Sequence, residues 1–346
     1  MITRFLLFVC ALSVAYPSCI LAALADSART IRNGHDLLAA PGGEATASAV
    51  ISKGIDQTLT NSDLLLVQLP WSPTQTNLPA LANWISTIAH RHQRTLAIAV
   101  DWQEPVRTRL LGAGKNPWRF ANDRTRRLFL HSVTETASTY HPDYFVLGVE
   151  VNYYYAHLFP EDFAGFVQTF RAAKAQIKQV SPQTKVLVTF QYELMTGRDQ
   201  SWSASPDFTP ISAFGDELDL VGISAYPFLA GLKAADVSSR YFEALQTVHK
   251  PKAIFETSWP TPTHGAQREQ AQYLERLLPI CNVMRMRLLI WTATTDTTES
   301  PPSSDGDIHL HQSDWMKFLG LWELNCSPKQ AVRVWQQWKP SDLHHP

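Results

Sequence analysis

Two glutamates stand where short apolar segments of the sequence end. Glu150 follows the segment Tyr144–Gly148, and Glu256 follows Lys252–Phe255. A carboxylate at the end of a buried segment has to be paired, hydrogen-bonded or functional, because desolvating it alone is costly. Aromatic residues end the neighbouring apolar segments. Flat aromatic faces stack on pyranose rings while carboxylates act as acid, base or nucleophile, so the combination indicates a sugar site. The aromatic candidates are Trp71, Trp102, Trp259, Trp291 and Tyr226.

Further polar residues follow the same segment ends. Asp101 comes directly after the apolar run Thr95–Val100, and we expect it either to line the site or to cap a loop. Asn152, two residues after the first glutamate, is a further candidate for substrate binding. Glu104 and Glu193 lie past their segment ends among polar residues, where we expect them to be solvated or to support the site from behind.

The elements that must position these residues alternate between strands and helices. The strand segments are continuous apolar runs, which is typical of parallel strands buried on both faces. Seven of them, in one stretch from 26 to 346, predict a single α/β domain with the (β/α)8 TIM barrel fold. They are 64–69, 95–100, 144–148, 185–190, 218–224, 252–255 and 288–291, and the helical segments are 78–92, 122–140, 162–180, 234–248, 267–283, 315–322 and 330–338.

The first strand of the predicted barrel is weakly defined. We expect it between Arg29 and Ile55, with Ala47–Ile51 as a candidate, although that stretch is rich in glycine and alanine. An open doubly wound sheet is the alternative fold. It would be announced by a glycine-rich first turn, and the sequence contains neither G-x-G-x-x-G nor G-x-x-x-x-G-K-[ST]. In a barrel, functional side chains cluster at the carboxyl ends of the strands, where the candidates above lie.

The composition excludes several classes of protein. The chain has 346 residues, of which 45% are hydrophobic and 18% charged, a balance typical of a globular protein rather than a disordered or multispan membrane one. Lys and Arg total 30 against 31 for Asp and Glu. Without a basic excess, a nucleic acid is not an expected partner.

The first 25 residues have the pattern of a secretory signal peptide. Arg4 precedes the apolar stretch Phe5–Ala15, and Ala23–Ala25 has the small-x-small form of a cleavage site. We therefore expect a secreted or periplasmic protein that is cleaved after residue 25 and then has no membrane span. A membrane anchor is less favoured because Pro17 interrupts a stretch already short for a span. Cys19 sits in a poor context for lipidation.

Two cysteines remain after such a cleavage. Cys281 and Cys326 form an even pair, and in an oxidising compartment they are a candidate disulfide, with two buried free thiols as the alternative. The sequence has no Cys-x-x-Cys or Cys/His cluster that would indicate a metal site, and His309 and His311 fall in a polar loop. No metal or organic cofactor is required by the chemistry proposed for the glutamates.

Three motifs resemble those of a known clan of enzymes. They are Gly148-Val149-Glu150-Val151-Asn152, Asp219-Leu220-Val221-Gly222-Ile223-Ser224-Ala225-Tyr226-Pro227 and Phe255-Glu256-Thr257-Ser258-Trp259-Pro260. They look like the strand-four, strand-six and strand-seven motifs of the large clan of retaining glycoside hydrolases with two catalytic glutamates. Within that clan they most resemble the arabinogalactan endo-β-1,4-galactanases, glycoside hydrolase family 53. The segment Asp101-Trp102-Gln103-Glu104-Pro105 sits where that family has a polar, aromatic end of strand three. The resemblance runs from residue 63 to residue 296.

The resemblance implies a role for each matching residue. Glu150 would be the general acid/base and Glu256 the nucleophile of a retaining reaction, with their carboxyl groups about 5 to 5.5 Å apart. Tyr226 would hydrogen-bond the nucleophile, and Trp291 would form a platform for a sugar ring. The motif numbering also places the missing strand first, before Leu64.

One position departs from the pattern of the clan. An asparagine that binds the sugar 2-hydroxyl stands just before the acid/base in the clan, and here that position is Val149. Two functions follow. The first is an exported glycoside hydrolase acting on a β-linked polysaccharide or oligosaccharide, which the two intact glutamates favour. The second, which Val149 favours, is a catalytically silent glycan-binding barrel of an envelope or exopolysaccharide system. A cytosolic enzyme of the same fold acting on phosphorylated metabolites is disfavoured by the signal pattern and by the absence of a glycine-rich phosphate loop.

Overall fold

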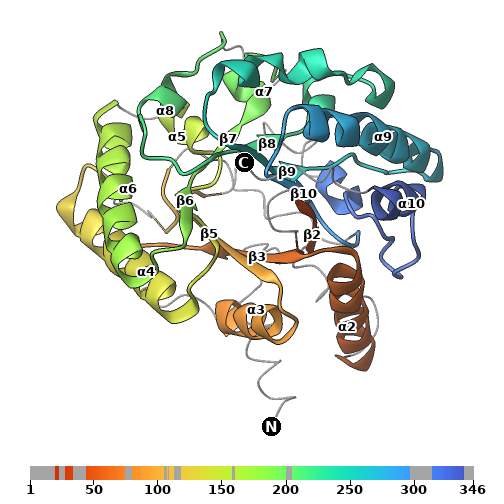
Figure 1. Cartoon of the computed structure of the whole chain (residues 1–346), viewed down its shortest axis with the longest axis horizontal. Coiled ribbons are helices and arrows are strands. Elements are labelled where there is room, and N and C mark those ends of the chain that lie inside the picture. The colour runs from red at the N-terminus through yellow and green to blue at the C-terminus, as the bar shows by residue number, and fades with distance from the viewer. Residues whose placement is uncertain are drawn as a thin grey trace.

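The computed structural model describes residues 20–22, 28–33, 44–74, 80–104, 107, 109–112, 118–157, 160–199, 205–296 and 314–338. Parallel strands form a ring with helices outside it (Figure 1). These strands are β2 (Ala28–Asn33), β3 (Leu64–Pro70), β4 (Thr95–Asp101), β5 (Tyr144–Val146), β6 (Lys185–Leu187), β7 (Thr189–Gln191), β8 (Val221–Ala225), β9 (Lys252–Thr257) and β10 (Leu288–Trp291).

The two ends of the sheet are neighbouring parts of one chain segment. The strand order is β6-β5-β4-β3-β1-β2-β10-β9-β8-β7. Only Val188 separates β6 from β7, so the segment 185–191 pairs with β5 through its first half and with β8 through its second half. The sheet thus returns to its starting strand, with β6 and β7 together as the fifth of eight barrel strands. This is the (β/α)8 architecture predicted from the sequence.

The helices largely follow the predicted segments. The α-helices are α2 (Glu44–Asn61), α3 (Ala80–Arg91), α4 (Asp123–Tyr140), α5 (Val151–His157), α6 (Pro160–Val180), α7 (Tyr192–Met195), α8 (Thr209–Ser212), α9 (Gln267–Val283) and α10 (Gln330–Gln337). The 3-10 helices are η3 (Pro227–Ala230), η4 (Ala234–Asp236), η5 (Ser239–Thr247), η6 (His264–Ala266) and η7 (Asp314–Phe318). The predicted helix 234–248 is therefore two 3-10 helices, because Val237 and Ser238 between them are extended. The predicted helix 315–322 is only the short η7.

The first barrel strand is β2, and the candidate Ala47–Ile51 is wrong. That stretch lies inside α2, as its alanine content favours. The strand Ala28–Asn33 starts one residue before the expected window and pairs in parallel with β10. It precedes Leu64, as the motif numbering implied.

A further short strand, β1 (Ile20–Ala22), lies between β2 and β3 and is antiparallel to both. It falls within the segment that the sequence predicts to be a signal peptide. Cleavage after Ala25 would remove β1, the strand that pairs with both β2 and β3.

The core has two layers, which follow from the alternation of side chains along each strand. An inner layer fills the barrel and contains alternate strand residues such as Leu64, Leu66, Ala97, Ala99, Ala253, Phe255, Leu288 and Ile290. An outer layer lies between the strands and the helices, and contains the intervening residues such as Leu65, Ile98, Ile254 and Leu289. The face of a strand-end side chain is therefore decided by its parity along the strand.

The two cysteines are separate thiols, so the predicted disulfide is wrong and the alternative of buried free thiols holds. Cys281 is on α9 and Cys326 follows η7, and both are buried and unbridged. Burial raises the pKa of the Cys281 thiol above its ordinary value, which keeps it protonated and unreactive. Within the described ranges, no helix has the length and apolarity needed to cross a membrane.

Candidate active site

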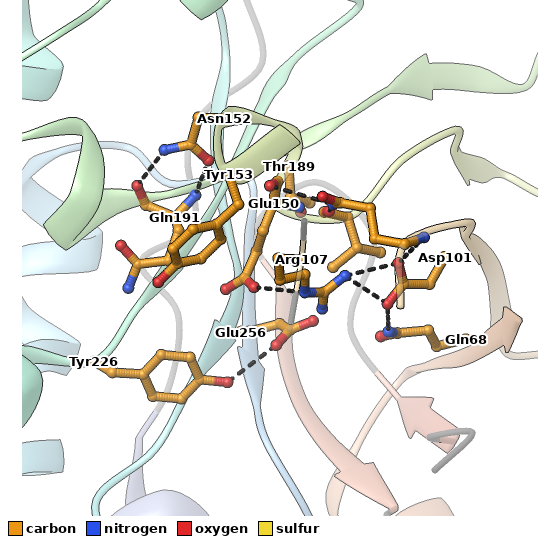
Figure 2. A network of polar contacts seen from close by, with 12 residues as sticks. Gln68, Asp101, Arg107, Glu150, Asn152, Tyr153, Thr189, Gln191, Tyr226 and Glu256 are labelled. Atoms are coloured by element: carbon orange, nitrogen blue, oxygen red, sulfur yellow. Dashed lines mark hydrogen bonds and ion pairs between the residues drawn. The ribbon is translucent and has the colours of Figure 1, made fainter. Parts of the chain in front are cut away.

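The inner face of the barrel ends in polar residues on β3 and β4. Leu64 and Leu66 face the barrel axis, so the period of two places Gln68 on the same face. By the same alternation Ala97 and Ala99 lead to Asp101. The two side chains meet, because Gln68 Nε2 donates to Asp101 Oδ2 at 3.0 Å. Figure 2 shows this pair at the edge of a larger polar network.

A β-bulge in β9 turns Glu256 toward the same space. Ile254 belongs to the outer core layer, and Thr257 contacts Tyr273 of the outer helix α9. These two outward residues are three positions apart rather than two, because the pairing of β8 with β9 shifts register between them. Phe255 and Glu256 can therefore both face inward, and β-bulges next to active sites commonly re-aim a side chain in this way.

Glu150 is held by an unusual backbone conformation at the end of β5. Its φ is 49°, in the left-handed region that a glutamate rarely adopts. The surroundings stabilise this conformation: Glu150 N donates to Thr189 Oγ1 at 2.9 Å, and Gln103 Nε2 donates to the Val149 carbonyl at 2.5 Å. A strained residue that its neighbours hold in place is typical of a functional site.

Arg107 joins these carboxylates, although the sequence patterns did not single it out. Its Nη1 donates to both oxygens of Asp101 at 2.7 Å, and its Nε lies 3.5 Å from Glu150 Oε2. Figure 2 shows the guanidinium between Glu150 and Asp101, with Glu256 beside it. Arg107 comes from the loop after β4, and nothing in its local sequence marks it apart from its proximity to a strand end.

The environment of Glu150 raises the pKa of its carboxyl to about 7. Burial is the largest cause, since it disfavours the charged form. The Arg107 guanidinium acts in the opposite direction, and the nearby carboxylate of Glu256 adds to the rise. At neutral pH a substantial part of Glu150 is therefore protonated and able to donate a proton.

Glu256 accepts a hydrogen bond from Tyr226, as the resemblance implied. The Tyr226 hydroxyl donates to Glu256 Oε2 at 3.0 Å and also lies 3.1 Å from Thr292 Oγ1. The tyrosine ring packs against Trp315 and Phe228, with centroid separations of 5.7 Å and 5.9 Å. The aromatic packing and the hydrogen bonds together orient the hydroxyl toward the carboxylate.

Glu193 is fully buried, so of the two expectations for it the structure bears out support of the site from behind rather than exposure to solvent. Its carboxyl accepts hydrogen bonds from the Tyr226 backbone N at 2.9 Å, from Gln191 Nε2 at 2.6 Å and from the Tyr241 hydroxyl. Burial raises the pKa of Glu193 to about 7, although these hydrogen bonds favour the ionised form. Glu193 thus supports the strand end that carries Tyr226.

Trp71 and Trp102 lie in the outer core layer, so the prediction that they contact sugar is wrong. Their exposed fractions are 1% and 0%. Trp71 Nε1 donates to Ser132 Oγ of α4 at 3.0 Å, and Trp102 Nε1 donates to the Leu147 carbonyl at 2.9 Å. Each follows an inward position at a strand end, so the alternation turns its ring toward the helices, and neither ring presents a face to solvent.

Trp259 and Trp291 are buried in the same outer layer, and the platform role expected for Trp291 is also wrong. Both rings pack against Tyr273 of α9, with centroids 5.1 Å and 6.0 Å away. Trp291 is 0% exposed and its Nε1 donates to the Leu319 carbonyl at 2.9 Å. The neighbouring Thr292, rather than Trp291, faces the candidate site.

Asn152 binds the backbone of β7 instead of pointing into the site. Its Nδ2 donates to the Gln191 carbonyl and its Oδ1 accepts from the Gln191 backbone N, both at 2.8 Å. Figure 2 shows this amide turned away from the two glutamates. With both polar atoms committed, Asn152 anchors α5 to the sheet, and the prediction that it binds substrate is wrong.

Over the part of the chain that is described, no group of three or more His, Cys, Asp or Glu could hold a metal ion.

The sequence of this chain is similar to a known protein family. Residues 132–285 match the sequence model of glycosyl hydrolase family 53. The match spans 154 of the 346 residues, so the chain is similar to this family over somewhat less than half of its length. The matched segment holds Glu150, Tyr226 and Glu256, while Asp101 and Arg107 precede it, and the match confirms the resemblance seen in the motifs. No curated protein sequence matches significantly.

Solved glycoside hydrolases share the fold at low sequence identity. An exo-β-1,4-mannosidase from Opitutaceae bacterium strain TAV5 is 13% identical with a TM-score of 0.62, and the match covers 91% of this chain but 57% of the mannosidase. A GH5_18 protein from Streptomyces cattleya, in complex with Manβ1-4GlcNAc, is 13% identical with a TM-score of 0.63, covering 84% and 76% of the two chains. Fungal β-1,4-galactanases are 16% identical with a TM-score of 0.55, covering 82% and 91%.

Proposed function

We propose that this protein is a glycoside hydrolase that cleaves a β-linked polysaccharide or oligosaccharide with net retention at the anomeric carbon. The observation that carries the proposal is the placement of Glu150 and Glu256 on the inner face, each with different partners. Glu150 is buried with its pKa raised to about 7, while Glu256 accepts a hydrogen bond from Tyr226. Two carboxyls in different environments suit an acid and a nucleophile.

In the first step Glu256 attacks the anomeric carbon while Glu150 gives its proton to the leaving oxygen. The bond from carbon to the leaving oxygen breaks, and a glycosyl ester forms on Glu256. In the second step Glu150, now ionised, takes a proton from water as the water attacks the same carbon. The ester bond breaks and Glu256 returns as a carboxylate. The hydroxyl of Tyr226 keeps Glu256 oriented for the attack.

The choice of a β-linked glycan rests on the family match and on the structural neighbours. The family comparison indicates a glycosidase, and the named neighbours include β-1,4-galactanases and a β-1,4-mannosidase. A polysaccharide of β-linked galactose is therefore the first substrate to test. The position of Val149, where the clan has an asparagine, supports the alternative of a barrel that binds glycan without cleaving it.

The experiment measures reducing ends released from a panel of β-linked polysaccharides that includes β-galactan. The wild-type protein is compared with Glu256→Gln and with Glu135→Gln, a control at an exposed glutamate of α4. We expect release by the wild type and the control, and at least a 10³-fold loss in Glu256→Gln, roughly the effect of removing a nucleophile. Proton NMR of the first product formed reports whether the anomeric configuration is retained.

Two results would redirect the proposal. An inverted first product would replace the nucleophile role of Glu256 with that of a general base. A folded wild-type protein that binds one of the glycans and releases nothing would establish the silent barrel. In that case Val149→Asn is the variant in which activity should first appear.

Export is part of the same proposal and rests on the signal pattern of the first 25 residues. The native protein would be recovered from the periplasm or medium with Asp26 as its first residue. Fractionation followed by N-terminal sequencing tests this. Recovery of the uncleaved chain from the cytoplasm would contradict it.

A further inference from the structure

A hairpin after β4 carries Arg107 into the candidate site. Gln103 and Leu110 form an antiparallel bridge, and Leu111 N donates to the Trp102 carbonyl at 2.8 Å. Arg107 lies near the turn of this hairpin with a φ of 59°, and its N donates to the Glu104 carbonyl at 2.8 Å. Glu104 N also donates to the Arg109 carbonyl at 3.0 Å, so backbone contacts on both sides of Arg107 hold it at this position.

The guanidinium is anchored before it reaches Glu150. Both Asp101 oxygens accept from Arg107 Nη1 at 2.7 Å, and Gln68 holds Asp101 from the far side at 3.0 Å. The side chain of Arg107 is 19% exposed and that of Asp101 15%. A charge-assisted contact of this kind, shielded from water, is strong and directional. Arg107 is therefore fixed by β3 and β4, independently of the acid/base.

The same guanidinium faces both glutamates. Its Nε lies 3.5 Å from Glu150 Oε2, and Figure 2 places it beside Glu256. Burial would by itself lower the pKa of Arg107, but the charges of Asp101, Glu150 and Glu256 outweigh it and leave the pKa above its ordinary value. Arg107 is thus a permanent positive charge between Glu150 and Asp101, with Glu256 beside it.

We propose that Arg107 is a positioning residue for Glu150 that stabilises its ionised form when water is to be activated. The inference rests on the proposed function. Before the first step, the negative charge of Glu256 opposes ionisation of Glu150 and so offsets Arg107. Once Glu256 is esterified that charge is gone, and the guanidinium is left to favour the carboxylate of Glu150. The proton of the attacking water then passes to Glu150, and the electron pair of the broken ester bond returns to Glu256.

Among the residues that the structure describes, no other group around Glu150 can replace Arg107 in this role. The charged or titratable groups that act on Glu150 are Arg107 from the hairpin, Asp101 at the end of β4 and Glu256 on β9, with Tyr153 on α5 alongside. The Ser224 hydroxyl on β8 also acts on Glu150 and lowers the pKa of its carboxyl. Among them Arg107 supplies the positive charge, because the carboxylates oppose ionisation and the tyrosine and serine are neutral.

The first test uses an aryl β-glycoside with an activated leaving group, which makes the second step limiting. We expect Arg107→Met to lower kcat by at least about 10²-fold, in the range found for impaired general acid–base steps. The acidic limb of the kcat profile should move to higher pH by roughly one unit. Arg107→Lys keeps the charge. The acidic limb of its kcat profile should therefore lie within about half a pH unit of the wild-type limb, while kcat falls. Arg109→Met is the control, because Arg109 lies in the same hairpin but pairs with Glu104.

A merely structural role predicts a different result. It would lower kcat for Arg107→Met without moving the acidic limb of the kcat profile along the pH axis. That result would overturn the inference while the proposed function stands. Chemical rescue separates the two in another way. Guanidinium ion at low millimolar concentration should restore part of the activity of Arg107→Ala and none to a variant that has lost its fold.

The second test does not depend on activity. The Glu150 carboxyl is titrated by carbon NMR in protein labelled at glutamate, with Glu150→Gln providing the assignment. Arg107→Met should raise the pKa of Glu150, and Arg109→Met should leave it unchanged. An unchanged Glu150 titration in folded Arg107→Met would refute the inference, whether or not the wild-type protein hydrolyses a glycan.

Discussion

At the scale of single residues, Glu150 combines a strained backbone with a raised pKa. Its backbone φ is 49°, and contacts from Thr189 and Gln103 hold the backbone there. A position that costs backbone energy persists when the surrounding contacts determine it. The geometry of the proposed acid/base is therefore a property of its neighbours as much as of its own residue type.

The pH dependence of the proposed first step follows from this residue. Glu150 must be protonated to donate to the leaving group, and its pKa in the free protein is about 7. We expect kcat/KM for a substrate with a poor leaving group to fall above about pH 7, with a tenfold loss per pH unit. A pH profile between 4 and 10 measures this. Replacement by Glu150→Gln should abolish the basic limb along with most of the activity.

The raised pKa of Glu193 predicts how the free energy of unfolding depends on pH. Its folded-state pKa of about 7 lies above the ordinary value near 4.5, so the folded state retains a proton that the unfolded state has lost. The free energy of unfolding should therefore fall as the pH rises from about 4.5 to 7, by up to roughly 3 kcal/mol from this group. Urea unfolding at pH 5 and pH 7.5 tests it. Glu193→Gln should flatten the part of the slope that belongs to Glu193, and an equal slope in the variant would contradict the assignment.

At the scale of elements, parity along each strand decides which residues meet in the site. Asp101 and Trp102 are adjacent at the end of β4, yet Asp101 faces Arg107 and Trp102 faces the helices. In β9 the bulge changes the count and adds Glu256 to the inner face after Phe255. A strand end therefore delivers alternate residues to the site, and a bulge is the device that alters the alternation.

The buried tryptophans should consequently matter for stability rather than for sugar binding. Trp102 packs against Phe120, Tyr154 and Phe166 with centroids 4.7 to 5.0 Å away. Trp102→Ala should lower the free energy of unfolding by about 3 to 5 kcal/mol, as other large-to-small core changes do. The milder Trp102→Phe should lower Tm and leave the KM of an active protein unchanged. A rise in KM without loss of stability would return Trp102 to the list of sugar contacts.

At the scale of the whole molecule, the barrel brings together groups from distant parts of the chain. Contacts link Gln68 of β3, Arg107 of the β4 hairpin and Glu150 after β5 through Asp101, and Glu256 of β9 lies beside them (Figure 2). The parallel ring places all these strand ends at one end of the barrel. Gln68 and Glu256 are 188 residues apart in the sequence, and the arrangement of the strands in the barrel brings them to the same end of it.

The two buried thiols give a prediction for the whole fold. Cys281 and Cys326 are unbridged and buried, so a reducing agent should leave Tm unchanged. In a chain that begins at Asp26, a thiol reagent should react slowly while the protein is native and should react with both cysteines once it is unfolded. Thermal melts with and without dithiothreitol, and reagent titration in guanidinium chloride, measure this. A Tm that falls on reduction would indicate a disulfide.

The sequence by itself determined the strand-helix rhythm, the barrel class and the pair of glutamates. Continuous apolar runs report parallel strands, and a carboxylate at the end of such a run is costly enough to mark a site. The bond from Tyr226 to Glu256 followed from the family motifs and is present. The first strand was misplaced because Ala28–Asn33, with the sequence ARTIRN, is not a continuous apolar run, while the candidate Ala47–Ile51 folds as helix.

Only the tertiary structure decided which residues around the glutamates face them. Trp71, Trp102, Trp259 and Trp291 are the right residue type at strand ends, but their outward parity buries them against helices. Both polar atoms of the Asn152 amide are hydrogen-bonded to the backbone of β7. Arg107 has no sequence signature, because its role depends on a hairpin that folds it between carboxylates separated from it along the chain. Residue type and spacing are local properties, whereas a shared charge environment exists only once the barrel has assembled.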